Sequence, residues 1–96
     1  MFKELDPLLH SQLRLSVISI LVSVKEAEFS FLRERTGATA GNLSVQIGKL
    51  SDAGYIDVHK SFRDNYPLTT CKITPKGLKA FESYVENLKQ YIQPGG

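Results

Sequence analysis

The chain has 96 residues, of which 42% are hydrophobic and 23% charged, and its formal net charge is +2. These values are typical of a globular domain and exclude the disordered, collagen-like and low-complexity classes. The lone cysteine, Cys71, excludes an intramolecular disulfide and a zinc ribbon and indicates a reducing cytoplasm. Residues 1–6 do not resemble a signal peptide, and the apolar run 17–24 is far too short to span a membrane. We therefore expect one cytoplasmic domain over residues 1–96, ordered from about 6 to 92.

The first predicted helix starts at Asp6, which can cap the first turn, and Pro7, which suits the first helical position. Apolar residues then occur on nearly every side of the helix as far as Val24. A helix of this kind is either central to its domain or shared with a second subunit.

Two short helices follow, and together they predict a helix-turn-helix. Ser30 and Thr39 can cap them, and Gly37 and Gly54 lie where they end. The second of these helices carries an apolar series at i, i+4 and i+7, formed by Leu43, Ile47 and Leu50.

The residue period then changes from that of a helix to that of a strand. Residues 55–60 and 69–74 alternate between apolar and polar, which predicts two strands with one buried face each. Between them we expect a polar connection over 61–68 that Pro67 ends, so the pair forms a β-hairpin.

Thr74 and Pro75 predict the start of the last helix, because a capping residue is followed by proline at the first helical position. Its apolar residues are spaced 3-4-3-4, which is typical of a helix that packs along another helix. They are Leu78, Phe81, Val85, Leu88 and Ile92. The predicted fold class is mainly α with a small β-hairpin (α+β), in the order helix-helix-helix-hairpin-helix.

The positive charge is concentrated in one segment. Residues 60–79 contain five lysines and arginines and one acidic residue, Asp64, for a local balance of +4. Such a segment in a nearly neutral chain points to a polyanionic partner.

The block Thr39–Ile56, read TAGNLSVQIGKLSDAGYI, and the block Ile73–Leu78, read ITPKGL, resemble the winged helix domain of MarR- and ArsR-type transcription regulators. The resemblance extends over most of the chain, from about Asp6 to Ile92. It implies a winged helix-turn-helix with a recognition helix at 39–53 in the DNA major groove. The hairpin would be the wing, with residues 60–68 on the adjacent minor groove or the phosphate backbone.

The side of the recognition helix away from its apolar series is short and polar. Asn42 and Gln46 can pair with adenine, Ser44 suits a base or a phosphate, and Val45 can touch a thymine methyl group. Many relatives have a long polar residue at the position of Val45, so this valine departs from the family pattern. The expected DNA contacts are Thr39, Asn42, Ser44, Val45, Gln46, Lys49, Lys60, Arg63 and Asn65.

The first and last helices are the predicted dimerisation elements. The residues assigned to the dimer interface are Leu8, Leu15, Ile18, Leu78, Phe81, Val85, Leu88 and Ile92. A homodimer would place two recognition helices about 34 Å apart, which predicts a palindromic operator. A small domain with no separate activation surface acts most simply as a repressor.

Two other interpretations stay open: a winged helix that binds proteins, and a ligand-responsive sensor of the MarR kind with an unidentified small-molecule effector. A steep salt dependence of DNA binding separates the first of these from a regulator. Catalysis has no support, because no nucleophile–base arrangement or phosphate-binding glycine loop is present. His10 and His59 are far apart in sequence, so we expect no metal and no cofactor.

Overall fold

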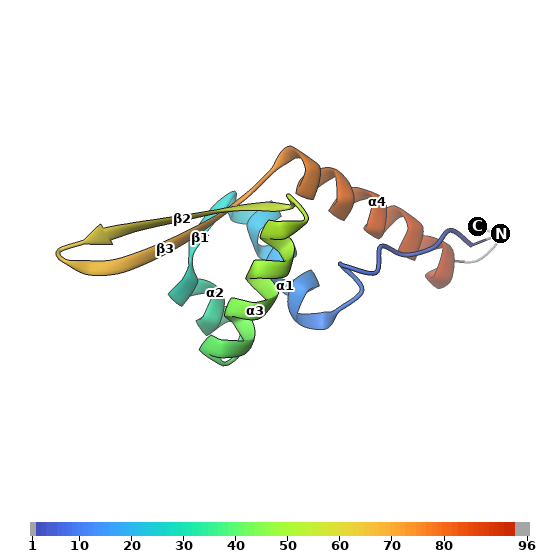
Figure 1. Cartoon of the computed structure of the whole chain (residues 1–96). Coiled ribbons are helices and arrows are strands. Elements are labelled where there is room, and N and C mark those ends of the chain that lie inside the picture. Colours follow the sequence, from blue (N-terminus) through green and yellow to red (C-terminus); the bar gives the residue numbers. More distant parts are fainter. Residues whose placement is uncertain (1, 94–96) are drawn as a thin grey trace.

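The computed structural model of the chain describes residues 2–93 (Figure 1). In order, the elements are α1 (Gln12–Val24), β1 (Glu26–Glu28), α2 (Phe29–Thr36), α3 (Ala40–Asp52), β2 (Ile56–Arg63), β3 (Tyr66–Ile73) and α4 (Pro75–Ile92). The predicted fold class and element order are confirmed, with the addition of the short strand β1, which the sequence pattern did not predict.

The first helix begins later than predicted. Asp6 does cap a turn, since its Oδ1 accepts from the Leu8 N–H at 2.9 Å and its carbonyl accepts from the His10 N–H at 2.9 Å. That turn ends at once, because Ser11 is extended and its Oγ caps a new helix by accepting from the Arg14 N–H. The chain thus has two capping residues five positions apart, Asp6 and Ser11, and the helix follows the second.

Helix α1 is the central helix of the domain, which is the first of the two alternatives that its apolar character left open. Val17, Ile18 and Leu21 are fully buried within the single chain and pack with Leu32 and Leu43. Ile18 is therefore a core residue of the protomer, and its assignment to a dimer interface is wrong.

Helix α2 starts at Phe29, after Glu28, so the predicted cap Ser30 lies inside the helix. The cause is β1, whose pairing with β3 fixes the chain up to Glu28 and leaves the helix to begin immediately afterwards. The end of the helix is as predicted, because Gly37 adopts a left-handed conformation with φ of 73°. Thr39 then caps α3, where its Oγ1 accepts from the Asn42 N–H at 3.2 Å.

The strands form an antiparallel sheet in the order β1-β3-β2, and β2 and β3 are longer than predicted. The predicted polar loop 61–68 shrinks to a two-residue turn at Asp64 and Asn65, both of which have positive φ. Such a turn suits the right-handed twist of a hairpin. Pro67 lies in β3 opposite Phe62, the second pair from the turn, where the strand nitrogen is not needed for pairing with β2.

Helix α4 begins as predicted, with the Thr74 Oγ1 accepting from the Gly77 N–H at 3.0 Å. Gly77 is required there, because a Cβ atom would lie 2.1 Å from the carbonyl oxygen of Tyr55. Further along, α4 buries Tyr84 against the core, whereas Val85 and Ile92 are 37% and 69% exposed. The 3-4-3-4 series therefore lies only partly against the rest of the chain.

The hairpin and α4 extend in opposite directions from the body formed by α1, α2 and α3 (Figure 1). The N-terminal segment lies along the far end of α4, where Phe2 stacks on Tyr91 at 4.8 Å between ring centroids and the Tyr91 hydroxyl donates to the Lys3 carbonyl. Among residues 2–93, no helix combines the length and the apolar character that crossing a membrane requires.

Candidate nucleic-acid interface

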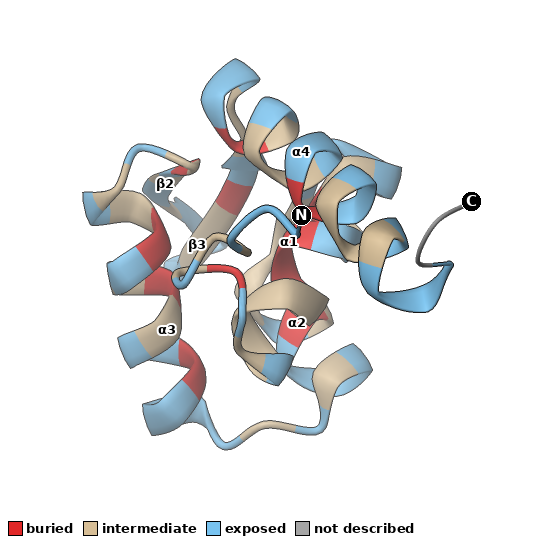
Figure 2. Ribbon diagram, turned by 90° about the vertical axis from the view of Figure 1, so that its right-hand side faces the viewer, coloured by how far each residue is buried: buried red, intermediate tan, exposed pale blue. Residues whose placement is uncertain are grey.

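Helix α3 has one buried face and one exposed face (Figure 2). Leu43, Ile47 and Leu50 are at most 5% exposed, which fixes the helix to the core. Away from the buried face, a Cβ atom added at Gly41 or Gly48 would meet no atom within 4 Å other than its chain neighbours and the backbone of α3 itself. Packing therefore does not require these glycines, but they leave the outer surface of the helix flat and open to a close approach.

Two amide side chains of this face are hydrogen-bonded to each other. The Gln46 Nε2 donates to the Asn42 Oδ1 at 3.1 Å, one helical turn apart. Gln46 is half-buried, and its Oε1 accepts from an Nη1 of Arg14 on α1. Asn42 is exposed, so of the two amides only Asn42 is fully presented to the outside.

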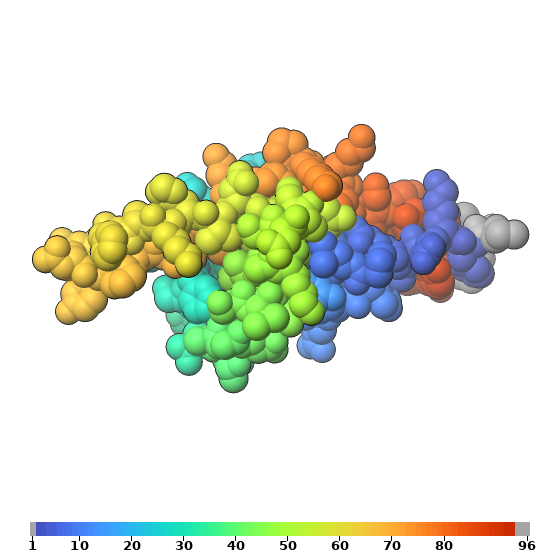
Figure 3. All heavy atoms as spheres, viewed as in Figure 1, coloured from blue at the N-terminus to red at the C-terminus, as the bar shows by residue number. Residues whose placement is uncertain are grey.

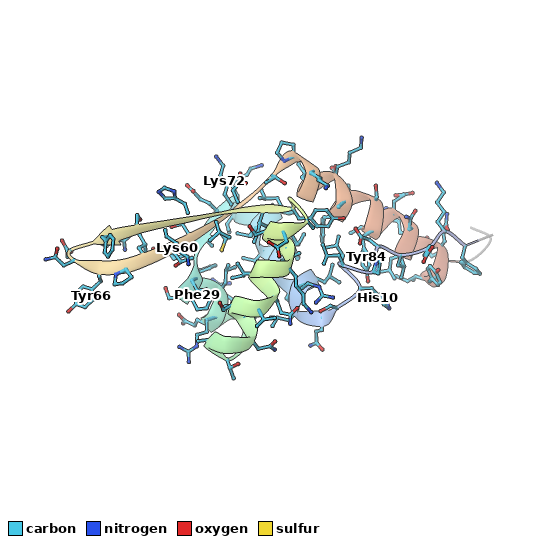
Figure 4. The ribbon with its side chains drawn as sticks, in the orientation of Figure 1. His10, Phe29, Lys60, Tyr66, Lys72 and Tyr84 are labelled. Carbon is cyan, nitrogen blue, oxygen red and sulfur yellow. The ribbon has the colours of Figure 1, made fainter. Side chains whose placement is uncertain are left out.

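A groove of about 440 Å³ lies between α3 and the hairpin. Its walls are Ser44, Gly48 and Asp52 on one side, Val58, Lys60 and Thr69 on the other, with Phe29 among the lining residues. Lys60 lies on the side of the hairpin that faces Phe29 and α3, and Lys72 lies on the opposite side (Figure 4). A cation is therefore placed directly beside the exposed face of α3.

The outer end of the hairpin projects beyond the helices (Figure 3). Arg63 and Asn65 are exposed there, and Arg63 Nη2 lies 3.5 Å from the Glu28 Oε2 in a solvent-exposed pair. Such pairs contribute about 0–1 kcal/mol, so the pair leaves Arg63 free to change partners. Phe62 and Tyr66 are each 75% exposed at the same end.

A family model described as the winged helix DNA-binding domain matches residues 13–92, which run from α1 to the end of α4. The chain belongs to this winged helix family. The helix-turn-helix of the winged helix is α2 and α3, and its wing is the hairpin of β2 and β3.

Individual proteins agree with the family. An uncharacterized protein of Methanocaldococcus jannaschii is 32% identical over 81 residues, which cover 84% of this chain and 88% of that protein. A transcriptional regulator homologue from Pyrococcus horikoshii superposes with a TM-score of 0.83 and 28% identity, covering 88% of this chain and 84% of that one. The protein NadR, solved in complex with 4-hydroxyphenylacetate, has a TM-score of 0.72 and 20% identity, covering 90% of this chain and 63% of that one.

The solved neighbours include a transcriptional regulator homologue and an ArsR family transcriptional regulator, and together with the family model they confirm the predicted winged helix resemblance. The family is described as a DNA-binding domain, and the Pyrococcus horikoshii neighbour is described as a transcriptional regulator homologue.

The winged helix brings most of the predicted DNA contacts onto α3 and the wing. All but Gln46 are exposed: Thr39, Asn42, Ser44, Val45, Lys49, Lys60, Arg63 and Asn65. Thr39 also caps α3, and Gln46 is held at both ends by Arg14 and Asn42. Sequence reasoning missed Arg14, which is 32 positions from Gln46, and it missed Phe62 and Tyr66, although aromatic residues beside the Asp64–Asn65 turn were a visible signal.

The titratable groups with shifted pKa values lie away from the exposed face of α3 and from the wing tip. Burial raises the pKa of the Cys71 thiol to about 11, so the cysteine is neutral at physiological pH, as a structural residue is. Burial and then the hydrogen bond to Asp6 raise the pKa of Tyr55 to about 12.

His10 Nδ1 and the Tyr84 hydroxyl lie 3.1 Å apart (Figure 4). Within residues 2–93, no cluster of three or more His, Cys, Asp or Glu side chains is suited to hold a metal ion.

Proposed function

We propose that the protein is a sequence-specific regulator of transcription in the cytoplasm that binds double-stranded DNA. The observation that carries the proposal is the flat polar face of α3 beside a groove whose other wall supplies Lys60, in a chain of the winged helix family. An α-helix of this kind fits the major groove, and a cation beside it suits the flanking phosphates.

The contacts divide between base reading and phosphate binding. Asn42, Ser44 and Val45 are exposed on α3 and face the base edges in the proposed complex, with Val45 suited to a thymine methyl group. Thr39, Lys49 and Lys60 are assigned to phosphates. The exposed surface is thus suited both to a specific sequence and to DNA in general.

The wing reaches the adjacent minor groove or its backbone in this proposal. Asn65 at the turn and Arg63 beside it supply polar contacts, and Arg63 exchanges Glu28 for a phosphate. Phe62 and Tyr66 supply apolar surface, which minor-groove proteins use against the sugars and base steps.

The proposed active form is a homodimer of single-domain chains that represses transcription from a palindromic operator. The outer face of α4 supports it, because an apolar series at dimer-like spacing is left partly uncovered by the protomer. The interface excludes the buried Ile18 and consists of Leu8, Leu15, Leu78, Phe81, Val85, Leu88 and Ile92. In this proposal, repression follows from occupying the promoter, where the bound dimer blocks the polymerase.

The test is fluorescence anisotropy with the DNA upstream of the protein's own gene and a scrambled duplex, each in a salt series. We expect tighter binding to the upstream DNA and a loss of affinity of about 1,000-fold between 50 and 200 mM salt if six or more phosphates are contacted. The double variant Lys49→Ala, Lys60→Ala should reduce the affinity and make the salt dependence shallower.

The matched control is Lys79→Ala, Lys89→Ala on α4, which removes the same charge away from α3 and the wing. Equal losses of affinity in the two double variants would contradict the assigned DNA surface. Binding that depends on neither salt nor sequence would contradict the regulator and favour a winged helix that binds proteins.

A second candidate function is response to a small aromatic acid, which the complex of NadR with 4-hydroxyphenylacetate suggests. A hollow of about 410 Å³ between the N-terminal segment and α4 has Tyr55 and Tyr84 for an aromatic ring and Lys76 and Lys79 for a carboxylate. Adding 4-hydroxyphenylacetate should raise the Tm of the wild type and not that of Lys76→Ala; equal shifts, or none, would remove this candidate.

A further inference from the structure

We propose that Arg14 is a positioning residue that fixes the base-reading amide of Asn42 through Gln46. The inference rests on the proposed function, since it assigns a cause to the sequence preference of α3. It starts from one side chain on α1 that joins two other parts of the chain.

The Arg14 guanidinium is held in place by two acceptors. Its Nε donates to the Leu8 carbonyl at 2.6 Å, in the turn that precedes α1, and its Nη1 donates to the Gln46 Oε1. Both hydrogen bonds are partly buried. Because the guanidinium is planar and its donors form a rigid fork, two acceptors on different segments fix its orientation.

Chemistry then sets the direction of every bond in the chain of contacts. Arginine has donors only, so Gln46 must turn its oxygen toward Arg14 and its nitrogen away from it. That nitrogen is a donor, so Asn42 must turn its oxygen toward Gln46, where the two atoms lie 3.1 Å apart. The Nδ2 of Asn42 therefore lies on the outer side of its amide, and in the described part of the chain it donates to no other residue.

The consequence for DNA reading is a fixed amide in place of one that samples two orientations. To pair with adenine, an asparagine must present its nitrogen to N7 and its oxygen to the N6 amino group at the same time. The Asn42 oxygen keeps one lone pair beyond the contact with Gln46, so the pairing is retained in a single orientation. Ordering a free side chain on binding weakens the complex by about twofold to tenfold, and Arg14 removes that loss in advance.

The same contacts change the role of Gln46. Its oxygen faces α1 and its nitrogen faces Asn42, so its amide is engaged at both ends before DNA arrives. Gln46 transmits the orientation set by Arg14, and Asn42 contacts the base.

The variants separate this role from a structural one. Arg14→Met removes both contacts of the guanidinium, and Arg14→Lys keeps the charge but loses the fork. Gln46→Met leaves the contact of Arg14 with Leu8 and breaks only the transmission to Asn42. The measured quantity is the discrimination ratio, which is the affinity for the operator divided by that for duplexes with one base pair changed, and in which a uniform charge effect cancels.

We expect Arg14→Met, Arg14→Lys and Gln46→Met each to lower this ratio about threefold to tenfold, and only at the base pair at which Asn42→Ala relaxes it. In the Asn42→Ala background, Arg14→Met should lower the ratio no further. A loss spread equally over all base pairs, or an undiminished effect of Arg14→Met in the Asn42→Ala background, would overturn the proposal.

A measurement without DNA separates this inference from the proposed function. In the free protein, the Asn42 side-chain amide should have a high NMR order parameter that falls in Arg14→Met and in Gln46→Met. An amide equally mobile in all three proteins overturns the role of Arg14, whatever the DNA result. An ordered amide in a protein with no sequence preference for any duplex overturns the regulator, and with it the base-reading role assigned here.

Discussion

The two regions that face DNA in the proposed complex, α3 and the tip of the wing, are built in opposite ways. Helix α3 is held by three buried side chains, by the Thr39 cap and by the contact of Gln46 with Arg14. The wing tip has only the two strands of the hairpin, because β1 pairs with β3 no further out than Thr70. In the proposed complex, α3 therefore acts as a preorganised surface and the wing adapts to the DNA.

The exposed residues of α3 and of the wing tip also differ in size and polarity. On α3 they are small or polar around two open glycines, apart from Val45, which favours a close and specific fit. At the wing tip, Phe62 and Tyr66 are three-quarters exposed. Large exposed apolar side chains are typical of surfaces that bind another molecule. Changes at the buried positions of α3 should therefore alter the stability of the whole domain, and changes at the tip should alter binding alone.

The largest expected effect is that of Leu50→Ala on α3. Leu50 is fully buried, so its truncation leaves a cavity and should lower the free energy of unfolding by about 2–5 kcal/mol. Urea denaturation followed by circular dichroism measures it. A loss below about 1 kcal/mol would contradict the account of α3 as a helix fixed by its buried face.

The double variant Phe62→Ser, Tyr66→Ser tests the wing tip. Because both side chains are exposed, we expect the free energy of unfolding to change by less than about 1 kcal/mol in total, or about 0.5 kcal/mol for each residue. The affinity for the operator should nevertheless fall, and anisotropy measures it. An unchanged affinity would show that the wing tip makes no contribution to the complex.

The smallest expected effect is a change of the free energy of unfolding with pH, and it depends on Cys71 and Tyr55, which lie away from the proposed DNA surface. The pKa of Cys71 is raised by burial from 9.0 to about 11, and that of Tyr55 by burial and by Asp6 from 10.0 to about 12. The unfolded chain releases these protons at a lower pH than the folded chain does. These two groups therefore leave the free energy of unfolding unchanged below about pH 9 and lower it as the pH rises from there toward 12.

Urea denaturation at several alkaline pH values measures this decrease. It should be smaller in Cys71→Val and in Tyr55→Phe, and unchanged in Phe62→Ser, whose side chain lies far out on the wing. A decrease that is equally large in all of these variants would exclude Cys71 and Tyr55 as its source.

The features of the fold that could be predicted from the sequence are those set by neighbouring residues. Thr39, Gly54 and the apolar series between them predict α3 because a cap, a stop and a helical period coincide locally. Strand β1 could not be predicted in this way, since Glu26–Glu28 has no strand pattern and becomes a strand only by pairing with β3. The start of α1 was predicted too early because two capping residues follow one another and the structure uses the second, Ser11.

In the candidate site, too, the features set by neighbouring residues could be predicted, whereas those set by contacts between distant segments could not. The exposure of Asn42 and Lys49 follows from the helical period, which the sequence displays. The contact between Arg14 and Gln46 depends on how α1 lies against α3, and no local pattern contains that information.

Hydroxyl-radical footprinting of the wild-type protein on its operator tests the central claim most directly. The account predicts two protected regions about one helical turn apart, related by the symmetry of the operator, each with an adjacent minor-groove protection that weakens in Phe62→Ser, Tyr66→Ser. Protection that is uniform along the duplex and the same on a scrambled sequence would contradict it.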